Sequence, residues 1–400
     1  MYRKTYIEVD LDNVCENIRN IVSTFKGYQY YIGVVKGNAY GYGEYISKYI
    51  VDNGINYLAV SSLEEAINVR KYVEDVPILC LEPISLDNIQ EIIKYKVTLC
   101  VSNIDYFEKL KKISCSNKIN FHLKLNTGMN RLGIDDKDLV KKIYDESMQG
   151  ANLCMEGIFT HLATSGVYDS LYKKQIGKFK ELVQDIDLSK IKIVHVGRSC
   201  TLDFFPKLDF CNGVRVGIMM YGVESTFPVY RSGILGRIQY MKHQYFYKKN
   251  NLPVPYSEAK INLKQALSLK SEVIEIQKVS RGDNVGYGSN CKMESDGYIA
   301  VLPIGYADGI FTNYHDLKVT IGDCEYPVVG SINMGMITVY VDDKVKVGDV
   351  VTIIDSEKSY KKMARSFGIS PYVFLTSLRR EIPRIYYKNG KIDKVIEDGE

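Results

Sequence analysis

Between Tyr30 and Tyr221, short apolar runs, often β-branched, alternate with longer segments in which apolar residues recur at helical spacing. The runs are almost continuously apolar, as expected for parallel strands that are covered on both faces of a sheet. Eight such runs occur: YYIGVVK, YLAVSS, VPILCLE, VTLCVS, INFHLKLN, CMEGIFTHLA, IKIVHVG and GVRVGIMMYG. Eight strand–helix units in about 200 residues favour a closed (β/α)8 barrel. An open doubly wound sheet is the alternative, because the pattern alone does not determine closure.

The pattern changes after Gly222. The segment 229–250 is basic and rich in tyrosine, and it contains no acidic residue. From Ala266 onward, alternating strand-like segments and turns dominate, and helices are expected around 360–366 and 371–378. This second part of the chain is therefore predicted to be rich in β-structure.

These changes divide the chain into domains. We predict an α/β protein with an N-terminal barrel at 9–225, a basic insertion or linker at 226–262, and a C-terminal β-rich domain at 263–400. Residues 1–8 are expected to add a strand to the second domain. The insertion is interpreted as a solvated surface loop, and a lid or an interface element is the alternative.

Composition narrows the class of protein. The 400-residue chain has 46% hydrophobic and 25% charged residues and a formal net charge of +4, which gives no reason to expect nucleic acid as a partner. No apolar run approaches the roughly 20 residues of a membrane-spanning helix, and the N-terminus lacks the apolar core of a signal peptide. The nine cysteines form no CxxC pair, and the five histidines never fall at metal-ligand spacing. We expect a cytoplasmic protein with reduced thiols and no bound metal.

Lys36 follows the first apolar run directly, in the sequence VVKGNAYGYG. A lysine that merely caps a strand is the simplest interpretation. Active sites of parallel barrels, however, collect at the carboxyl ends of the strands. Polar or charged residues stand at five of the eight predicted strand ends: Lys36, Lys124 with Arg131, His161, Ser199 and Arg215. This coincidence favours a shared site over isolated surface residues.

The lysine suggests a kind of cofactor. A buried lysine loses stabilisation of its charge, so its pKa falls and its amine becomes nucleophilic. Such an amine could capture pyridoxal 5'-phosphate (PLP) as a Schiff base. The phosphate would then need backbone N–H groups and hydroxyls. The segments GNAYGYG, GRSC and VGIMM could supply them.

A series of motifs along nearly the whole chain resembles the alanine racemase family. VVKGNAYGYG resembles the family's VVKANAYGHG, with Gly37 and Tyr42 as the two departures. The further motifs, in order, are FHLKLNTGMNRLG, EGIFTHLAT, GVRVGIMMYG, NVGYGSNC and LPIGYADG. The resemblance implies a (β/α)8 barrel followed by a β-domain, in agreement with the interpretation of the hydrophobic pattern.

The resemblance also implies roles in binding PLP. Lys36 would form the Schiff base. Arg215 would face the pyridine nitrogen, and because a guanidinium cannot accept a proton, the ring would stay unprotonated and side reactions such as transamination would be discouraged. His161 would lie beside the ring and link to Arg215; a core histidine is the alternative. The phosphate would be held by Tyr40, Ser199, Gly217 and Ile218.

Racemisation needs two acid/base groups on opposite faces of the substrate. By resemblance these are Lys36 and Tyr287, and the tyrosine would reach the site from the second subunit of a homodimer. Tyr306 would also cross the interface and line the entrance. Arg131 would contact the phenolic oxygen of PLP or the substrate carboxylate. Lys124 matches a lysine that many members carry as a carbamate, which would orient the neighbouring arginine.

Departures from the family pattern gather on the substrate side. Met334 can still offer its backbone N–H to a carboxylate, but Gly335 replaces the usual aspartate. Arg380 replaces a tyrosine that normally touches the phosphate; it could bind the phosphate through a charge-assisted hydrogen bond or reach a polar substrate side chain. Further departures occur at Asn126, Gly166, Thr312 and Ser331.

The resemblance implies a homodimeric, PLP-dependent amino-acid racemase, an isomerase that interconverts L- and D-alanine and supplies D-alanine for peptidoglycan. Serine or a broader set of amino acids is the alternative substrate, because a pocket that binds a hydroxyl rejects an analogue lacking it. A decarboxylase of the same architecture is disfavoured by Tyr287 and by an arginine at the ring nitrogen. A non-catalytic PLP-binding paralogue is a more remote alternative, since such single-barrel proteins lack the β-domain.

Overall fold

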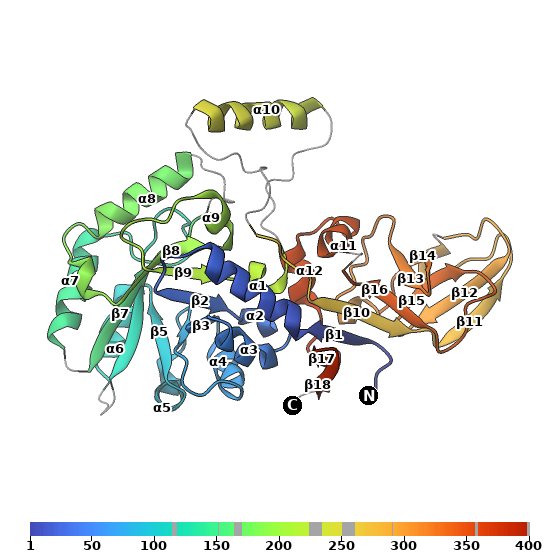
Figure 1. The fold of residues 1–400 in the computed structure, drawn as a ribbon, viewed down its shortest axis with the longest axis horizontal. Coiled ribbons are helices and arrows are strands. Elements are labelled where there is room, and N and C mark those ends of the chain that lie inside the picture. The colour runs from blue at the N-terminus through green and yellow to red at the C-terminus, as the bar shows by residue number, and fades with distance from the viewer. Residues whose placement is uncertain are drawn as a thin grey trace.

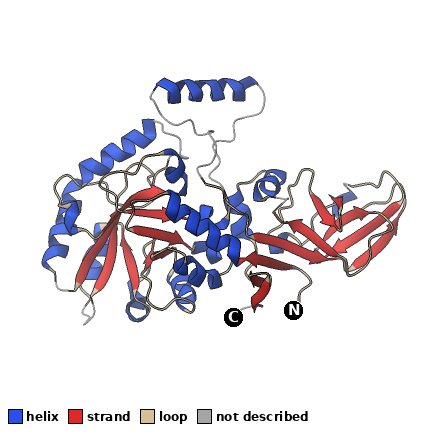
Figure 2. Cartoon of the chain, viewed as in Figure 1, coloured by secondary structure: helices blue, strands red, loops and turns tan. Residues whose placement is uncertain are grey.

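The computed structural model describes residues 1–113, 118–150, 152–163, 170–223, 234–249, 261–289, 291–356 and 359–397. They form a barrel domain and an elongated β-domain that extends away from it (Figure 1, Figure 2). Both chain termini lie near the junction of the two domains (Figure 1).

Eight parallel strands close into a barrel, so the predicted (β/α)8 architecture is confirmed. Closure is made by the first and last strands, where Tyr30 pairs with Gly213 and Ile32 with Arg215. The strands are β2 (Tyr30–Val34), β3 (Tyr57–Val60), β4 (Ile78–Cys80), β5 (Val97–Val101), β6 (Ile119–Lys124), β7 (Leu153–Phe159), β8 (Ile193–Arg198) and β9 (Gly213–Val216). Every residue of β3, β4 and β5 is buried, which explains why these runs are continuously apolar.

Helices connect the strands and cover the outside of the barrel (Figure 1). Several begin at a side-chain cap: Ser62 accepts a hydrogen bond from the backbone N–H of Glu65, and Asn103 from that of Tyr106. The helices are α1 (Leu11–Thr24), α2 (Lys36–Tyr40), α3 (Ser47–Asp52), α4 (Leu63–Arg70), α5 (Ile89–Lys94), α6 (Ile104–Lys111), α7 (Lys137–Gln149), α8 (Ser170–Leu182) and α9 (Ser199–Phe204). This alternation places every βα connection at one end of the barrel.

The second domain is built on a ten-stranded sheet in the order β11-β12-β15-β14-β13-β16-β10-β1-β17-β18. Strand β1 (Tyr6–Asp10) precedes the barrel in sequence but lies between β10 and β17. The other strands are β10 (Leu267–Glu272), β11 (Glu275–Val279), β12 (Gly297–Leu302), β13 (Lys318–Ile321), β14 (Cys324–Val329), β15 (Ile337–Val341), β16 (Val350–Ile354), β17 (Arg384–Lys388) and β18 (Lys391–Ile396). The two helices expected in this domain are present as α11 (Tyr360–Ser366) and α12 (Pro371–Ser377).

The described part of the basic insertion is helical rather than a loop. Helix α10 (Ile234–Lys249) lies apart from both domains (Figure 1). Its exposed Ile234, Ile238, Met241 and Tyr245 recur at helical spacing, a signal that the basic composition obscured. Residues 224–233 and 250–260 lie outside the described ranges, and no helix within those ranges is long and apolar enough to span a membrane.

Candidate active site

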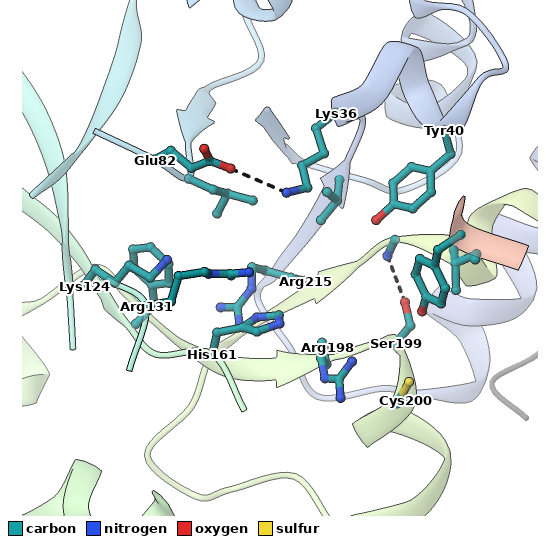
Figure 3. A pocket seen from close by; sticks show the side chains of 16 residues that line it. Lys36, Tyr40, Glu82, Lys124, Arg131, His161, Arg198, Ser199, Cys200 and Arg215 are labelled. Carbon is teal, nitrogen blue, oxygen red and sulfur yellow. Dashed lines mark hydrogen bonds and ion pairs between the residues drawn. The ribbon is translucent and has the colours of Figure 1, made fainter. Parts of the chain in front are cut away.

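A cavity of about 250 Å³ lies at the carboxyl ends of the barrel strands (Figure 3). Nine residues of the predicted site line it: Lys36, Tyr40, Lys124, Arg131, His161, Ser199, Arg215, Gly217 and Ile218. They come from the ends of five strands, β2, β6, β7, β8 and β9, or from the connections that follow them, so the barrel brings together side chains that are far apart in the sequence. Other predicted site residues lie outside the cavity lining and are described below.

Lys36 is placed by an unusual backbone turn. The residues after it, from Gly37 to Tyr40, all have positive φ values, between 48° and 64°. Three of these four residues are not glycine, and each such left-handed residue costs conformational energy unless its surroundings hold it. Glu65 supplies part of that support, because its Oε1 accepts a 2.6 Å hydrogen bond from the N–H of Gly37. Its Oε2 accepts hydrogen bonds from the backbone and hydroxyl of Ser61.

The lysine side chain points across the cavity toward a carboxylate (Figure 3). Lys36 Nζ lies 3.7 Å from Glu82 Oε1, and its side chain is 39% exposed. The expectation of a buried lysine is therefore wrong; the amine faces an open cavity and forms an ion pair. Sequence reasoning missed Glu82, although it follows β4 and stands at a strand end like the other site residues.

One end of the cavity is suited to an anion. Ser199 begins α9, and its hydroxyl accepts a 2.9 Å hydrogen bond from the N–H of Gly217. A Cβ atom on Gly217 would lie 2.9 Å from the hydroxyl oxygen of Tyr40, so glycine lets the tyrosine approach the backbone. Burial raises the pKa of Tyr40 to about 12, which keeps its hydroxyl a hydrogen-bond donor.

Tyr372 is a second contributor that the sequence did not reveal. It lies on α12 of the β-domain yet lines the cavity, and its ring centroid is 6.2 Å from that of Tyr40. Burial raises its pKa as well. A lone tyrosine in a helix carries no signal of such a role, because only the packing of α12 against the barrel brings it there. Hydroxyls and a helix start thus surround a space that fits a phosphate group, and Arg198 also lines the cavity.

Arg215 lies at the other side of the cavity (Figure 3). Its Nη1 contacts the ring Nδ1 and the carbonyl of His195 at 2.7 and 2.9 Å. Its Nη2 donates to the carbonyls of Thr160 and Val196 at 2.8 and 3.1 Å. These contacts occupy the four N–H bonds of the terminal nitrogens, which leaves Nε–H for a group in the cavity. Burial lowers the pKa of Arg215 to about 10, so it stays charged at neutral pH.

The expected link between His161 and Arg215 is not seen as a hydrogen bond among the described residues; His195 takes that place. His161 does line the cavity. Burial, followed by the charge of Arg215 and other cations, lowers the pKa of His161 to about 2, so the ring is neutral. Burial also lowers the pKa of Lys124, and the nearby Arg131 acts in the same direction. The cavity is therefore strongly receptive to anions.

Tyr287, Tyr306 and Met334 belong to the β-domain and lie outside the cavity lining of their own chain. All three side chains are exposed, Tyr287 by 76%. The backbone of Tyr287 accepts a hydrogen bond from the hydroxyl of Ser331. The segment of Tyr306 is joined to that of Met334, because the N–H of Ala307 donates to the carbonyl of Met334 at 2.9 Å.

Arg380 also lies outside the cavity lining. Its guanidinium forms an ion pair with the buried carboxylate of Glu44. The adjacent Arg384 is buried and donates to the carbonyl of Gly41 at 2.9 Å. Both arginines thus hold the segment that follows the left-handed turn. Of the other departures, Gly166 lies outside the described residues and Thr312 is exposed.

Fold and cavity together define a two-domain barrel protein suited to hold a phosphorylated carbonyl compound at the end of its first barrel strand. Within that class, the chain belongs to the alanine racemase family. The family model described as "Alanine racemase, N-terminal domain" matches residues 9–225, and "Alanine racemase, C-terminal domain" matches 266–386.

Individual proteins are similar over their full length. The chain is 32% identical to an alanine racemase of Halalkalibacterium halodurans over 406 residues, which cover 98% of each chain. It is 32% identical to alanine racemase 1 of Clostridium acetobutylicum over 98% of each chain. Among solved structures, alanine racemase of Clostridium difficile 630 superposes with a TM-score of 0.85 at 28% identity over 99% of each chain.

Proposed function

We propose that this protein interconverts L-alanine and D-alanine, with PLP as its cofactor and with active sites shared between two copies of the chain. The observation that carries this proposal is the convergence of Lys36, Arg215 and the Ser199–Tyr40 cradle on one cavity of a chain that matches both domain models of the alanine racemase family. The curated relatives are themselves alanine racemases.

The cavity residues fit PLP. When bound, PLP draws electron density from the α-carbon of an amino acid and so makes its α-proton acidic. Lys36 is the residue that would hold the aldehyde carbon through Nζ, with release of water, after leaving its ion pair with Glu82. Tyr40, Ser199 and the N–H groups of Gly217 and Ile218 would hold the phosphate, together with Tyr372. Arg215 would direct Nε–H at the ring nitrogen and His161 would lie beside the ring.

Two residues would move the proton. Lys36 would serve one face of the substrate, and Tyr287 of the second copy would serve the other face. The exposure of Tyr287 in the single chain supports this arrangement, because a catalytic tyrosine outside its own cavity needs a partner site to enter. Tyr306 and Met334, also exposed, would accompany it, with Met334 offering its N–H to the substrate carboxylate.

Arg131 would contact the substrate carboxylate or the phenolic oxygen of the cofactor. A carbamate on Lys124 would offset the charges of Arg131 and Arg215 and hold the arginine in place, because an anion between cations removes the cost of placing them together. The position of Arg380 favours alanine over serine. Its guanidinium pairs with Glu44 and lies outside the cavity lining, which supports alanine over a substrate with a polar side chain.

Chiral chromatography tests this function. The purified protein with PLP is incubated separately with L-alanine, L-serine and larger L-amino acids, and Lys36→Ala serves as the inactive control. D-Alanine is expected to form fastest, with at least about a hundredfold loss in the control. Faster formation of D-serine would contradict the alanine assignment, and no racemisation of any amino acid would contradict the activity.

A further inference from the structure

Polar side chains run through the middle of the barrel behind the cavity. They begin at Arg215 on β9 and continue through His195 on β8 and His122 on β6 to Glu156 on β7. Both histidines are completely buried, and Glu156 and Arg215 are 5% and 4% exposed. Barrel interiors are usually filled by bulky aliphatic side chains, so four connected polar groups at this place need an explanation.

Short contacts connect these groups in series. Arg215 Nη1 lies 2.7 Å from His195 Nδ1, and His195 Nε2 lies 2.8 Å from His122 Nδ1. His122 Nε2 then lies 3.6 Å from Glu156 Oε2, beyond hydrogen-bond distance, and it has no hydrogen-bond partner among the described residues, so this last contact is electrostatic. Two contacts of hydrogen-bond length and one longer charge contact therefore lead from the cavity into the barrel.

Arg215 at one end and Glu156 at the other fix the direction of hydrogen-bond donation along this series. Arg215 can only donate, so Nδ1 of His195 must accept and its proton must be on Nε2. His195 Nε2–H then donates to Nδ1 of His122, whose own proton lies on Nε2 and faces Glu156. Glu156 is an ionised carboxylate that can only accept, so its charge favours the proton of His122 on the nitrogen that faces it, Nε2. Both imidazoles are neutral and have the same tautomer.

The surroundings favour these protonation states. Burial lowers the pKa of His122 and lowers that of His195 well below its ordinary value. Burial opposes the ionisation of Glu156, but contacts with His122 and Lys192 outweigh it and bring the pKa of Glu156 to about 2. Glu156 also accepts hydrogen bonds of 2.7 Å from Lys192 Nζ and from the hydroxyl of Tyr57.

The backbone is irregular at both histidines. In the described barrel ladder, the register shifts between Phe121 and His122 and between His195 and Gly197, whereas the other six strand pairings run without a shift. Such bulges re-aim side chains next to functional sites. Gly157 on the neighbouring strand makes room for the ring, because a Cβ there would lie 2.6 Å from the imidazole of His122.

We propose that His195, His122 and Glu156 are positioning residues that hold Arg215 with its Nε–H toward the ring nitrogen of the cofactor. With His195 fixed as an acceptor, both terminal nitrogens of Arg215 are saturated and Nε–H alone is left for the cavity. The other tautomer of His195 would set two donors against each other and turn the guanidinium away. The inference rests on the proposed function for the identity of the ring.

Nitrogen NMR of the PLP-loaded, full-length protein with ¹⁵N-labelled histidine tests the series directly. Resonances are assigned with His122→Gln and His195→Gln. Both histidines are expected to show the Nε2–H tautomer and to keep it from about pH 6 to 9. A proton on Nδ1 of His195, or titration of either ring in that range, would overturn the proposal. This readout is independent of catalysis, so it stands apart from a failure of the proposed function.

A pair of matched variants tests the consequence for the reaction. Glu156→Gln replaces the acceptor-only carboxylate with a neutral amide that can also donate, at nearly constant shape, and Glu146→Gln changes a carboxylate on α7 that pairs with Lys111. For Glu156→Gln we expect kcat to fall at least about tenfold with little change in KM, because Arg215 loses its orientation. We also expect more conversion of PLP and alanine to pyridoxamine phosphate and pyruvate, in which alanine is oxidised and the cofactor aldehyde is reduced to the amine. Equal kcat and equal pyruvate yield in the two variants would overturn the proposal.

Discussion

At the scale of single residues, the site depends on a turn that most side chains avoid. Lys36 can face the cavity only because four residues after it adopt left-handed backbone angles. Glu65 binds the N–H of Gly37 with one oxygen and Ser61 with the other. The local sequence must therefore stabilise this turn as well as supply the lysine.

Replacement of this carboxylate should weaken the turn. In Glu65→Gln the side-chain amide would place an N–H against the backbone N–H of either Gly37 or Ser61. We therefore expect a loss of about 1–3 kcal/mol in the free energy of unfolding, together with weaker PLP retention. Glu64→Gln, at the exposed neighbouring position, is the control. Urea unfolding and the absorbance of retained PLP are the measurements. Equal behaviour of the two variants would show that Glu65 does not hold the turn.

Most cavity residues could be predicted because each follows an apolar strand or belongs to a recognisable motif. Tyr372 could not be predicted in the same way, because it comes from a helix of the other domain. Glu82 does follow the apolar run of β4, but it belongs to none of the recognised motifs. Arg380 was expected at the phosphate because its position in the motif was known, but its partner was not. An ion pair with Glu44, more than 300 residues away, is decided by tertiary packing.

At the scale of elements, the contact between α2 and α12 joins the site to the β-domain. Gly41 has a φ of +83°, and a Cβ there would lie 2.2 Å from the carbonyl oxygen of Leu375 on α12. This close approach keeps Tyr372 over the cavity. The two helices therefore behave as one supporting unit for the cofactor end of the site.

Gly41→Ala should push α12 away. Backbone strain and the clash with the carbonyl of Leu375 are expected to cost about 1–3 kcal/mol of stability or more, with a matching loss of PLP affinity. Gly177→Ala, in the open middle of α8, is expected to be neutral or to stabilise by up to about 1 kcal/mol. Thermal unfolding with and without PLP measures both effects. If the two variants had equal unfolding temperatures, the proposed contact would be wrong.

The order of elements was open to prediction, whereas their irregularities were not. All eight barrel strands were indicated by continuous apolar runs, since a strand buried on both faces has no room for alternation. The bulges at His122 and His195 leave no trace in that pattern. A histidine within an apolar strand can simply be part of the core, or it can position a site residue. The sequence does not distinguish these two possibilities; the series of contacts from Arg215 to Glu156 does.

At the scale of the whole molecule, buried neutral histidines should make the fold sensitive to acid. Burial lowers the pKa values of His122, His161 and His195, that of His161 to about 2. An unfolded histidine has a pKa near 6.5, so below that pH the unfolded state binds protons that the folded state excludes. Stability is therefore expected to fall as pH falls, by up to about 1.4 kcal/mol per pH unit for each histidine.

Urea unfolding at pH 7.5 and 5.5 checks this linkage. His161→Gln should remove about one third of the decrease in the free energy of unfolding between the two pH values, because one of the three buried histidines is no longer there to bind a proton on unfolding. His315→Gln, which changes a histidine outside this buried set, serves as the control. An unchanged loss in His161→Gln, or greater stability at the lower pH, would contradict the sign of the effect.

In the proposed homodimer, Lys36 of one chain and Tyr287 of the other form each active site. The most direct test mixes two inactive proteins, Lys36→Ala and Tyr287→Phe, under conditions that exchange subunits. Half of the dimers then carry both variants, and each has one intact site, so about a quarter of the unmodified racemisation activity should return. If the mixture stayed as inactive as its components, Lys36 and Tyr287 would have to act within the same chain, and the shared site would be wrong.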